Sequence, residues 1–372
     1  MAQSLPSFDE SSLPLNYSKW IYEVIQGSIP TEKLATCHDC AMCKKTGEPE
    51  ESAGLYFDPK VRCCSYIPEL PNFLIGRILL ENDPKNVPGR DKLIDRINGK
   101  LDATPLGLGS GKLYNLTYSN SGDAFGTSHH LRCPYYVENG DLCGIWKHRN
   151  SVCSTWFCKH ERGNYGFRFW DSVKRLLNSI ENDLAFACLK ELRLNNDAIH
   201  QLLLKKEENE PDNPARLLET PELDHKTDDK NYSILWGSWA GKEMDFYRQC
   251  AHFVNKLSWK EVLALCGPEV QLLIPLVQEA YNRLQESELP EFLETGSLKI
   301  SQITSDAVLI ETYSKYNPLS VPPFIFEILA GFDGSHTPDV LRKLLEEKNM
   351  EVDEDFVRIL VDYHILVPGM KD

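Results

Sequence analysis

Residues 167–192 have the sequence FRFWDSVKRLLNSIENDLAFACLKEL, in which large apolar residues recur every three or four positions. This spacing places the apolar residues on one face of an α-helix and the polar residues on the other. The apolar stripe consists of Phe169, Trp170, Val173, Leu176, Leu177, Ile180 and Leu184. Because such a stripe needs other elements to cover it, the stretch predicts a mainly helical protein with a buried core.

Shorter stretches on both sides of this helix carry local signals of the same kind. They predict further helices over residues 16–35, 72–80, 242–256, 259–265 and 268–284. Residues 83–111 are rich in Gly, Pro, Asn and Asp and predict a loop, whereas residues 112–118 alternate and predict a strand. Residues 205–232 are acidic and rich in proline, which is typical of an exposed linker.

The C-terminal residues have a pattern of short strands and helices. Strands are predicted at 298–303, 307–312 and 365–367, and an apolar helix at 322–330. Thr337 and Asp353 are suited to cap two further helices. This order of elements is that of a small winged-helix-like domain.

The predicted fold class is therefore α+β, mainly helical, with a cysteine-rich metal-binding domain and a small C-terminal winged-helix-like domain. The predicted domains are a cysteine-rich domain with a helical end at 1–204, an acidic linker at 205–232, a helical segment at 233–295 and the winged-helix-like domain at 296–372.

The overall composition narrows the classes of partner. Among its 372 residues the chain has 40 basic and 55 acidic side chains, which give a net charge of −15. Because phosphate groups are bound by positive surfaces, this balance argues against nucleic acids as partners. Residues 1–15 lack the apolar core of a signal peptide, and no apolar stretch is long enough to span a membrane. We therefore expect a cytoplasmic protein with no membrane partner.

Cysteine usage is the strongest functional signal in the chain. Nine of the twelve cysteines lie between residues 37 and 158, in two sets. In a cytosolic chain, thiols spaced so closely are more typical of metal ligands than of disulfides. The predicted metal ligands are Cys37, Cys40, Cys43, Cys63 and Cys64 in the first set, and Cys133, Cys143, Cys153 and Cys158 in the second.

The spacing leaves zinc and an iron–sulfur cluster open as the cofactor, since both take four thiolates. The C-x2-C-x2-C run from Cys37 to Cys43 is typical of ferredoxin sites, but Gly47 stands where those sites have a fourth cysteine. Two four-thiolate sites and one bridged multinuclear site both fit eight or nine thiols. Candidate supplementary ligands are His38, His129, His130, His148 and His160.

The alternative is that these thiols are buried, small apolar side chains that bind no metal. That interpretation suits Cys188, Cys250 and Cys266, each of which lies within an apolar helical face. It suits the run from Cys37 to Cys43 poorly, because charged residues surround those cysteines.

Residues 132–153, RCPYYVENGDLCGIWKHRNSVC, resemble the second half of the bacterial CxxCxxCC family, the YkgJ-like zinc- or iron-chelating proteins. The resemblance covers about residues 37–160. It matches Cys37, Cys40 and Cys43 to the early cysteine run of that family, and Cys133, Cys143 and Cys153 to the later one. A long insertion displaces the Cys63–Cys64 pair from the family's spacing. The resemblance implies metal chelation and no defined reaction.

The C-terminal domain is similar to the PqqD-like winged-helix domains, which bind leader peptides of ribosomally made, modified peptides. The similarity rests on a strand pair, an apolar helix followed by Phe332-Asp333-Gly334, the helix at Thr337 and the final strand. It implies a peptide or protein partner for residues 296–372. The alternative is a packing or dimerisation domain.

One glycine-rich stretch needs separate treatment. Residues 107–112, GLGSGK, suggest a phosphate-binding loop, but they lack the Walker spacing and precede the predicted strand at 112–118. A structural turn is the better interpretation.

Three hypotheses for function follow. The first is a metal-binding protein that holds zinc or an iron–sulfur centre through the clustered cysteines. The second is a metalloenzyme that modifies a peptide or protein delivered by the C-terminal domain, for which the sequence identifies no catalytic residues. The third is a structural zinc scaffold for protein assembly.

Overall fold

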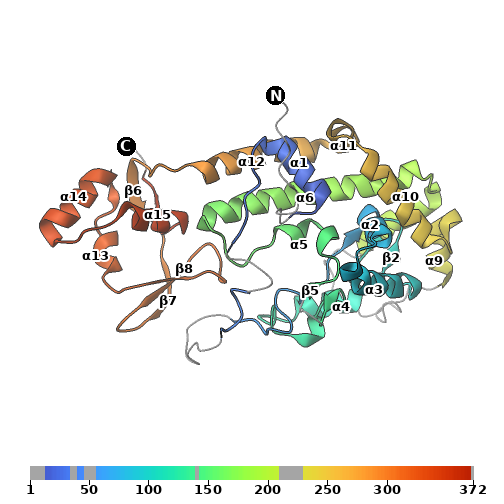
Figure 1. The fold of residues 1–372 in the computed structure, drawn as a ribbon, viewed down its shortest axis with the longest axis horizontal. Helices are drawn as coiled ribbons and strands as arrows, with labels where there is room; N and C mark the ends of the chain where they lie inside the picture. Colours follow the sequence, from blue (N-terminus) through green and yellow to red (C-terminus); the bar gives the residue numbers. More distant parts are fainter. Residues whose placement is uncertain (1–12, 34–39, 46–55, 139–141, 209–228, 370–372) are drawn as a thin grey trace.

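The computed structural model describes residues 13–33, 40–45, 56–138, 142–208 and 229–369. Over these ranges the protein is α+β and mainly helical, with small antiparallel sheets, as predicted. Figure 1 shows an elongated molecule, with a large helical body at one end and the C-terminal strands and helices at the other. No helix in the described part of the chain is long and apolar enough to cross a membrane.

The helical body is built around α6, which runs from Gly163 to Glu191 (Figure 1). Its predicted apolar stripe is buried, and Leu177 and Leu184 are completely shielded from solvent. α12 (Pro268–Gln285) lies along α6, and α1 (Leu15–Ile25) packs against α12. The covering elements therefore come from both ends of the body's sequence.

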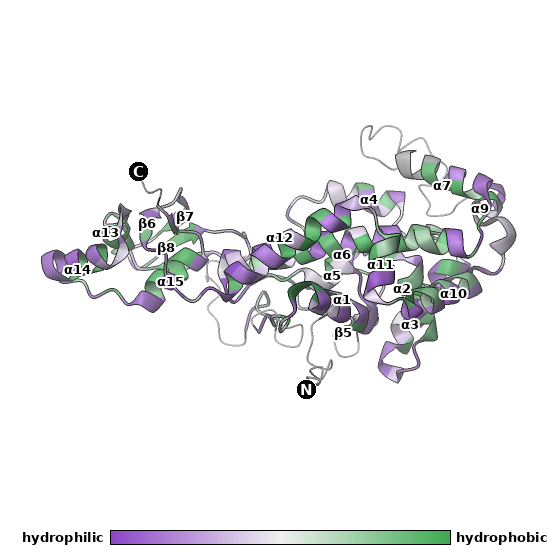
Figure 2. Cartoon of the chain, turned by 90° about the horizontal axis from the view of Figure 1, so that it is seen from above, coloured by the Kyte–Doolittle hydropathy of each residue, from purple (hydrophilic) through white to green (hydrophobic). Residues whose placement is uncertain are grey.

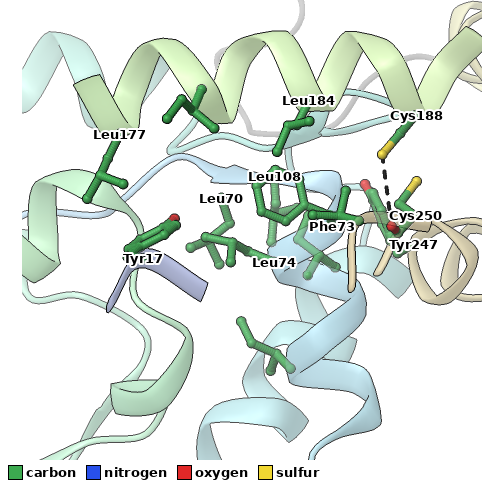
Figure 3. Close-up of a cluster of buried hydrophobic side chains, with 14 of the residues drawn as sticks. Tyr17, Leu70, Phe73, Leu74, Leu108, Leu177, Leu184, Cys188, Tyr247 and Cys250 are labelled. Atoms are coloured by element: carbon green, nitrogen blue, oxygen red, sulfur yellow. Dashed lines mark hydrogen bonds between the residues drawn. The ribbon is translucent and has the colours of Figure 1, made fainter. Parts of the chain in front are cut away.

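α2 (Asn72–Leu80) and α10 (Glu243–Lys256) form another close helix pair. Gly76 makes this approach possible, because a Cβ atom there would lie 1.9 Å from the carbonyl oxygen of Tyr247. Figure 3 shows how side chains from α2, α6 and α10 meet in one core. Helices that precede and follow the acidic segment at 205–232 thus share this core; residues 209–228 of that predicted linker lie outside the described residues.

Three cysteines were predicted to be core side chains. Cys188 and Cys250 are fully buried, and the Cys188 thiol lies 4.0 Å from the carbonyl oxygen of Cys250 (Figure 3). Cys266, which follows α11 (Trp259–Leu265), is half-buried. The prediction of burial is confirmed for the first two.

Shorter elements complete the body. The remaining α-helices are α3 (Val87–Asn98), α4 (Lys112–Ser119), α5 (Ser151–Thr155), α7 (Asn196–Glu208) and α9 (Asp229–Trp236). The 3-10 helices are η2 (Pro84–Asn86), η3 (His129–Leu131), η4 (Trp146–His148) and η6 (Gly237–Trp239). One sheet has the antiparallel order β1-β3-β2, from Leu70–Pro71, Gly107–Leu108 and Ala103–Thr104, and β4 (Tyr136–Val137) pairs with β5 (Leu142–Cys143).

The C-terminal domain has its own hydrophobic core. Its elements, in order, are β6 (Phe292–Thr295), β7 (Lys299–Ile303), β8 (Val308–Glu311), β9 (Leu319–Val321), α13 (Ile325–Leu329), β10 (Asp333–His336), α14 (Thr337–Lys348), α15 (Glu354–Asp362) and β11 (Leu366–Pro368). They form two antiparallel sheets, of order β10-β6-β11 and β7-β8-β9. Figure 2 shows hydrophilic residues over much of α14, at the end of the molecule.

Local signals located α1, α2, α6, α10, α11 and α12 in the body, although the helix predicted at 16–35 ends at Ile25. The helices α5, α7 and α9 were not predicted, and α7 ends and α9 begins within the predicted linker at 205–232. Two further predictions were wrong. Residues 83–111 were predicted to be a loop but contain α3, in which the sparse apolar residues Leu93 and Ile97 are buried four positions apart. The predicted strand at 112–118 is instead the helix α4. Tyr114 and Tyr118 stack four positions apart on that helix, with ring centroids 5.9 Å apart, and this spacing outweighed the apparent alternation.

The cap predictions for the C-terminal domain had mixed outcomes. Asp353 caps α15 as predicted, since its carboxylate accepts a hydrogen bond from the Asp355 N–H at 2.8 Å. Thr337 does not cap α14. It is the first residue of that helix, and its hydroxyl donates instead to the carbonyl oxygen of Pro290 at 2.9 Å.

Arg162 connects the helical body to the C-terminal domain. Its guanidinium binds both carboxylate oxygens of Asp362, at 2.7 and 2.9 Å, and Nη1 donates to the carbonyl oxygens of Leu284 and Glu286. One side chain therefore joins the start of α6, the end of α12 and the end of α15. Beside it, Gly163 has φ +48°, and a Cβ atom there would lie 2.3 Å from the Asp362 carbonyl oxygen.

Candidate metal centre

Eight of the nine predicted ligands lie within the described residues, and all eight are thiols in the structure. Cys37 and His38 lie outside the described residues. The eight thiols come from separate segments of the chain. We divide them into a first thiol group, which packs in a small apolar cluster, and a second thiol group, most of which packs in or against the main core.

The first thiol group consists of Cys40, Cys43, Cys63 and Cys158. These side chains pack with a small apolar cluster formed by Met42, Phe57, Phe125, Trp156 and Tyr316. The Cys43 N–H donates to the Cys40 carbonyl oxygen at 3.1 Å, which holds the turn between these two cysteines closed. Cys158 comes from the later cysteine set of the sequence, yet it joins the early cysteines here.

The second thiol group consists of Cys64, Cys133, Cys143 and Cys153. Cys133 is buried in the main core, and Cys64 and Cys143 pack against that core. The Cys133 N–H donates to the Cys64 carbonyl oxygen at 2.6 Å, which ties two segments together across the sequence. The Cys153 N–H donates to the side-chain oxygen of Asn150, which caps α5.

Burial makes these thiols reluctant to ionise. Burial, followed by the neighbouring Cys40 thiol, raises the pKa of both Cys43 and Cys158 to about 12. Burial, followed by Cys143, raises the pKa of Cys133 well above its ordinary value. For Cys63, the hydrogen bond with Cys64 is the largest cause of its raised pKa, and burial is the second. Because metals bind the thiolate, a cation would have to offset this cost.

Basic side chains near both groups act in the opposite direction. Beside the first group, Arg62 and Lys45 lower the pKa of Cys43 against the larger effect of burial. Beside the second group, Arg96 lowers the pKa of Cys133, and Arg149 lowers the pKa of Cys153. In both cases burial acts more strongly in the opposite direction. Arg149 is nearly buried and stacks on Trp146, and its Nη1 donates to the Cys153 carbonyl oxygen at 3.1 Å.

Within the described ranges, no three or more His, Cys, Asp or Glu side chains are arranged so that they could hold a metal ion. The thiols of each group therefore do not surround a common point. Their chemistry nevertheless fits the predicted cofactors, because zinc and iron–sulfur clusters prefer thiolate ligands. Binding would have to draw the thiols of a group together, as happens where a metal site forms on binding.

The candidate histidine ligands have other partners in several cases. A ring nitrogen of His129 lies 3.0 Å from the Asp58 carboxylate, and one of His148 lies 3.1 Å from that of Glu81. His160 packs against Tyr313, and His130 is exposed on η3. Burial lowers the pKa of His148 and His160 to about 4, so both rings are neutral near pH 7.

The contribution of the C-terminal domain to the first thiol group was not predicted. Tyr316, in the loop between β8 and β9, packs its ring 5.6 Å from that of Phe57 and 5.7 Å from that of Trp156. Next to it, Lys315 pairs with Asp123 at 2.8 Å. No local pattern could have identified Tyr316, because its partners lie far from it in the sequence.

The glycine-rich stretch before α4 forms a structural turn. The Gly111 N–H donates to the Asp102 carboxylate at 3.1 Å, and a Cβ atom on Gly109 would lie 2.1 Å from the same carboxylate oxygen. A carboxylate therefore already faces the beginning of α4, where a phosphate would have to bind.

A scan of protein-family models and searches of curated proteins and of solved structures find no match to this chain. The YkgJ-like and PqqD-like resemblances therefore stay predictions from the sequence motifs.

Proposed function

We propose that this protein binds metal, holding zinc or an iron–sulfur centre through its clustered cysteines. The observation that supports the proposal is that cysteines far apart in the sequence are neighbours: Cys158 packs in one small apolar cluster with Cys40, Cys43 and Cys63, and the Cys133 N–H donates to the Cys64 carbonyl oxygen. Four thiolates are the usual ligand set of structural zinc and of iron–sulfur clusters. The YkgJ-like motif at 132–153 points to the same chemistry.

Basic residues near the thiols favour the thiolate form that a metal binds. Arg62 and Lys45 lower the pKa of Cys43, and Arg149 lowers that of Cys153, although burial acts more strongly in the opposite direction. When bound, the metal would supply either a cross-link between segments or, as an iron–sulfur cluster, a site for electron transfer. The thiols would need a reducing compartment such as the cytoplasm to stay available, which is the location we propose.

The test is anaerobic purification followed by measurement of metal content, acid-labile sulfide and the visible absorption spectrum. Brown protein with iron and sulfide, bleached by reductant, would establish a cluster. Colourless protein with stoichiometric zinc that unfolds on chelation would favour the structural scaffold. Protein that stays metal-free when zinc or iron and sulfide are supplied under reducing conditions would contradict the proposal.

A second candidate is a metalloenzyme acting on a peptide bound by residues 296–372. Strand β7 favours peptide binding by this domain. All five residues of β7 are exposed, and the strand pairs with β8 on one side. Its apolar residues Ile300 and Ile303 are 39% and 63% exposed. An open edge strand of this kind can accept an extended peptide as an additional strand.

This candidate can be tested by selecting extended peptides from a library against the full chain. Replacing both Ile300 and Ile303 with Lys should abolish binding of the selected peptide. The matched control, Leu345→Lys, changes an apolar residue on α14 that is 51% exposed and should leave binding unchanged. Equal binding by all three proteins would rule out β7 as the peptide site.

A further inference from the structure

We propose that this protein forms a dimer in which α12 of one copy packs antiparallel against α12 of a second copy. The two-fold axis of this dimer would pass Leu276, in the middle of the helix. The proposal concerns a surface outside both thiol groups, and it does not depend on metal binding.

α12 is apolar on two of its faces. Its inner face is buried, because Val270, Val277 and Leu284 lie seven positions apart and none is more than 7% exposed. Its outer face carries Leu272 and Leu276, four positions apart, which are 73% and 52% exposed. Figure 1 shows α12 along the outer edge of the helical body, above α6. Large apolar side chains that share an exposed face mark an interaction surface.

A groove lies beside this outer face, between α12 and α6. Its volume is about 330 Å³, and it is lined on the α12 side by Leu276, Ala280 and Arg283 and on the α6 side by Phe167 and Arg168. Ala280 has the smallest side chain of the lining. A large apolar side chain of a partner can therefore enter the groove next to Ala280, as a knob enters a hole between packed helices.

The spacing along α12 identifies a second copy of the same helix as the occupant. When two copies of a helix pack antiparallel about one residue, positions equally far before and after that residue meet. Leu272 lies four positions before Leu276 and Ala280 four positions after it, so the second copy would place its Leu272 at the groove. Glu269 and Arg283 lie seven positions before and after Leu276, so these opposite charges would also meet.

Both charged residues are able to form this new pair. Arg283 binds Glu279 of its own helix at 2.7 Å, but both side chains are more than half exposed, and such a pair contributes little to stability. Glu269 is exposed, and one of its carboxylate oxygens accepts a hydrogen bond from the Ser179 hydroxyl at 3.1 Å. A parallel pair of helices would bring like charges together at both positions, so charge selects the antiparallel arrangement.

The first experiment measures the mass of the full chain by light scattering over a dilution series. The wild type should have twice the mass of one chain. Leu276→Lys should be a monomer, because it places two positive charges against each other at the axis. The matched control is Leu345→Lys on α14, where Leu345 is 51% exposed, and this variant should stay a dimer. A monomeric wild type or a dimeric Leu276→Lys variant would overturn the proposal.

Reversal of the charges tests the antiparallel register. Glu269→Arg and Arg283→Glu should each be monomeric, because each substitution places like charges opposite one another. An equimolar mixture of the two variants should form a mixed dimer, since both contacts then join a positive to a negative side chain. A mixture that stays monomeric, while circular dichroism shows both variants to be folded, would overturn the antiparallel pairing of α12.

Discussion

At the scale of single residues, the most unusual group outside the cysteines is Glu181. This carboxylate is buried in α6 and accepts hydrogen bonds from the Tyr17 hydroxyl and from both the N–H and the hydroxyl of Ser151. Burial raises its pKa to about 7, although the three hydrogen bonds oppose that effect. Glu181 therefore joins α1 and α5 to α6 and takes up a proton near neutral pH.

This pKa predicts a pH dependence of stability. Because the pKa of Glu181 rises from 4.5 in the unfolded chain to about 7 in the fold, its favourable contribution is complete below pH 4.5 and is lost as the pH rises through 7. The loss amounts to about 3 kcal/mol. Glu181→Gln should remove this dependence while keeping hydrogen-bonding groups in place.

The measurement is urea unfolding of both proteins between pH 4.5 and 8.5, with a chelator present throughout. The difference in unfolding free energy between wild type and variant should change with pH over that window. Parallel stability curves would contradict the raised pKa.

At the scale of elements, the packing of α2 against α10 depends on one missing side chain. Gly76→Ala would place a Cβ atom 1.9 Å from a backbone oxygen of α10, so the helices must separate. Overpacking of this kind should cost about 3 kcal/mol. Thermal or urea unfolding should detect it.

Gly267→Ala is the matched control, because the nearest atom to a Cβ there is 3.7 Å away, an ordinary contact. It changes the residue that precedes α12 and should cost about 1 kcal/mol or less. Similar losses of unfolding free energy in both variants would mean that the close approach of α2 and α10 does not require a glycine at position 76.

At the scale of the whole molecule, several contacts join the C-terminal domain to the body. Arg162 binds Asp362 in a largely buried place, and Tyr316 packs on the first thiol group. Motion of the C-terminal domain would therefore disturb the packing around these cysteines.

Asp362→Asn should weaken this junction, because the Arg162 guanidinium would lose its charged partner. The expected cost is about 2 kcal/mol. Hydrogen exchange of the amides in α15 should become faster. Asp123→Asn breaks the solvent-exposed pair with Lys315 and should change exchange little, since Asp123 is 86% exposed. Equal exchange rates in the two variants would mean that the Arg162–Asp362 pair stabilises the junction no more than the exposed Lys315–Asp123 pair does.

The sequence alone determined the elements with strong periodicity. The stripe at 167–192 predicted α6, and helical patterns predicted α2, α10, α11 and α12. These predictions were possible because the spacing of apolar residues along the chain sets which face of a helix is apolar. The close spacing of cysteines along the chain likewise identified the candidate ligands without knowledge of the fold. Where few apolar residues occur, as in α3, the local signal was too weak.

Only the tertiary structure decided which thiols lie together. Cys158 packs with Cys40 and Cys43, Cys133 hydrogen-bonds to Cys64, and Tyr316 reaches the first group from another domain. Such contacts depend on how whole elements cover one another's apolar faces, which spacing along the chain does not encode. Local composition therefore identifies the candidate ligands, and the packing of the loops and of the C-terminal domain decides which side chains surround them.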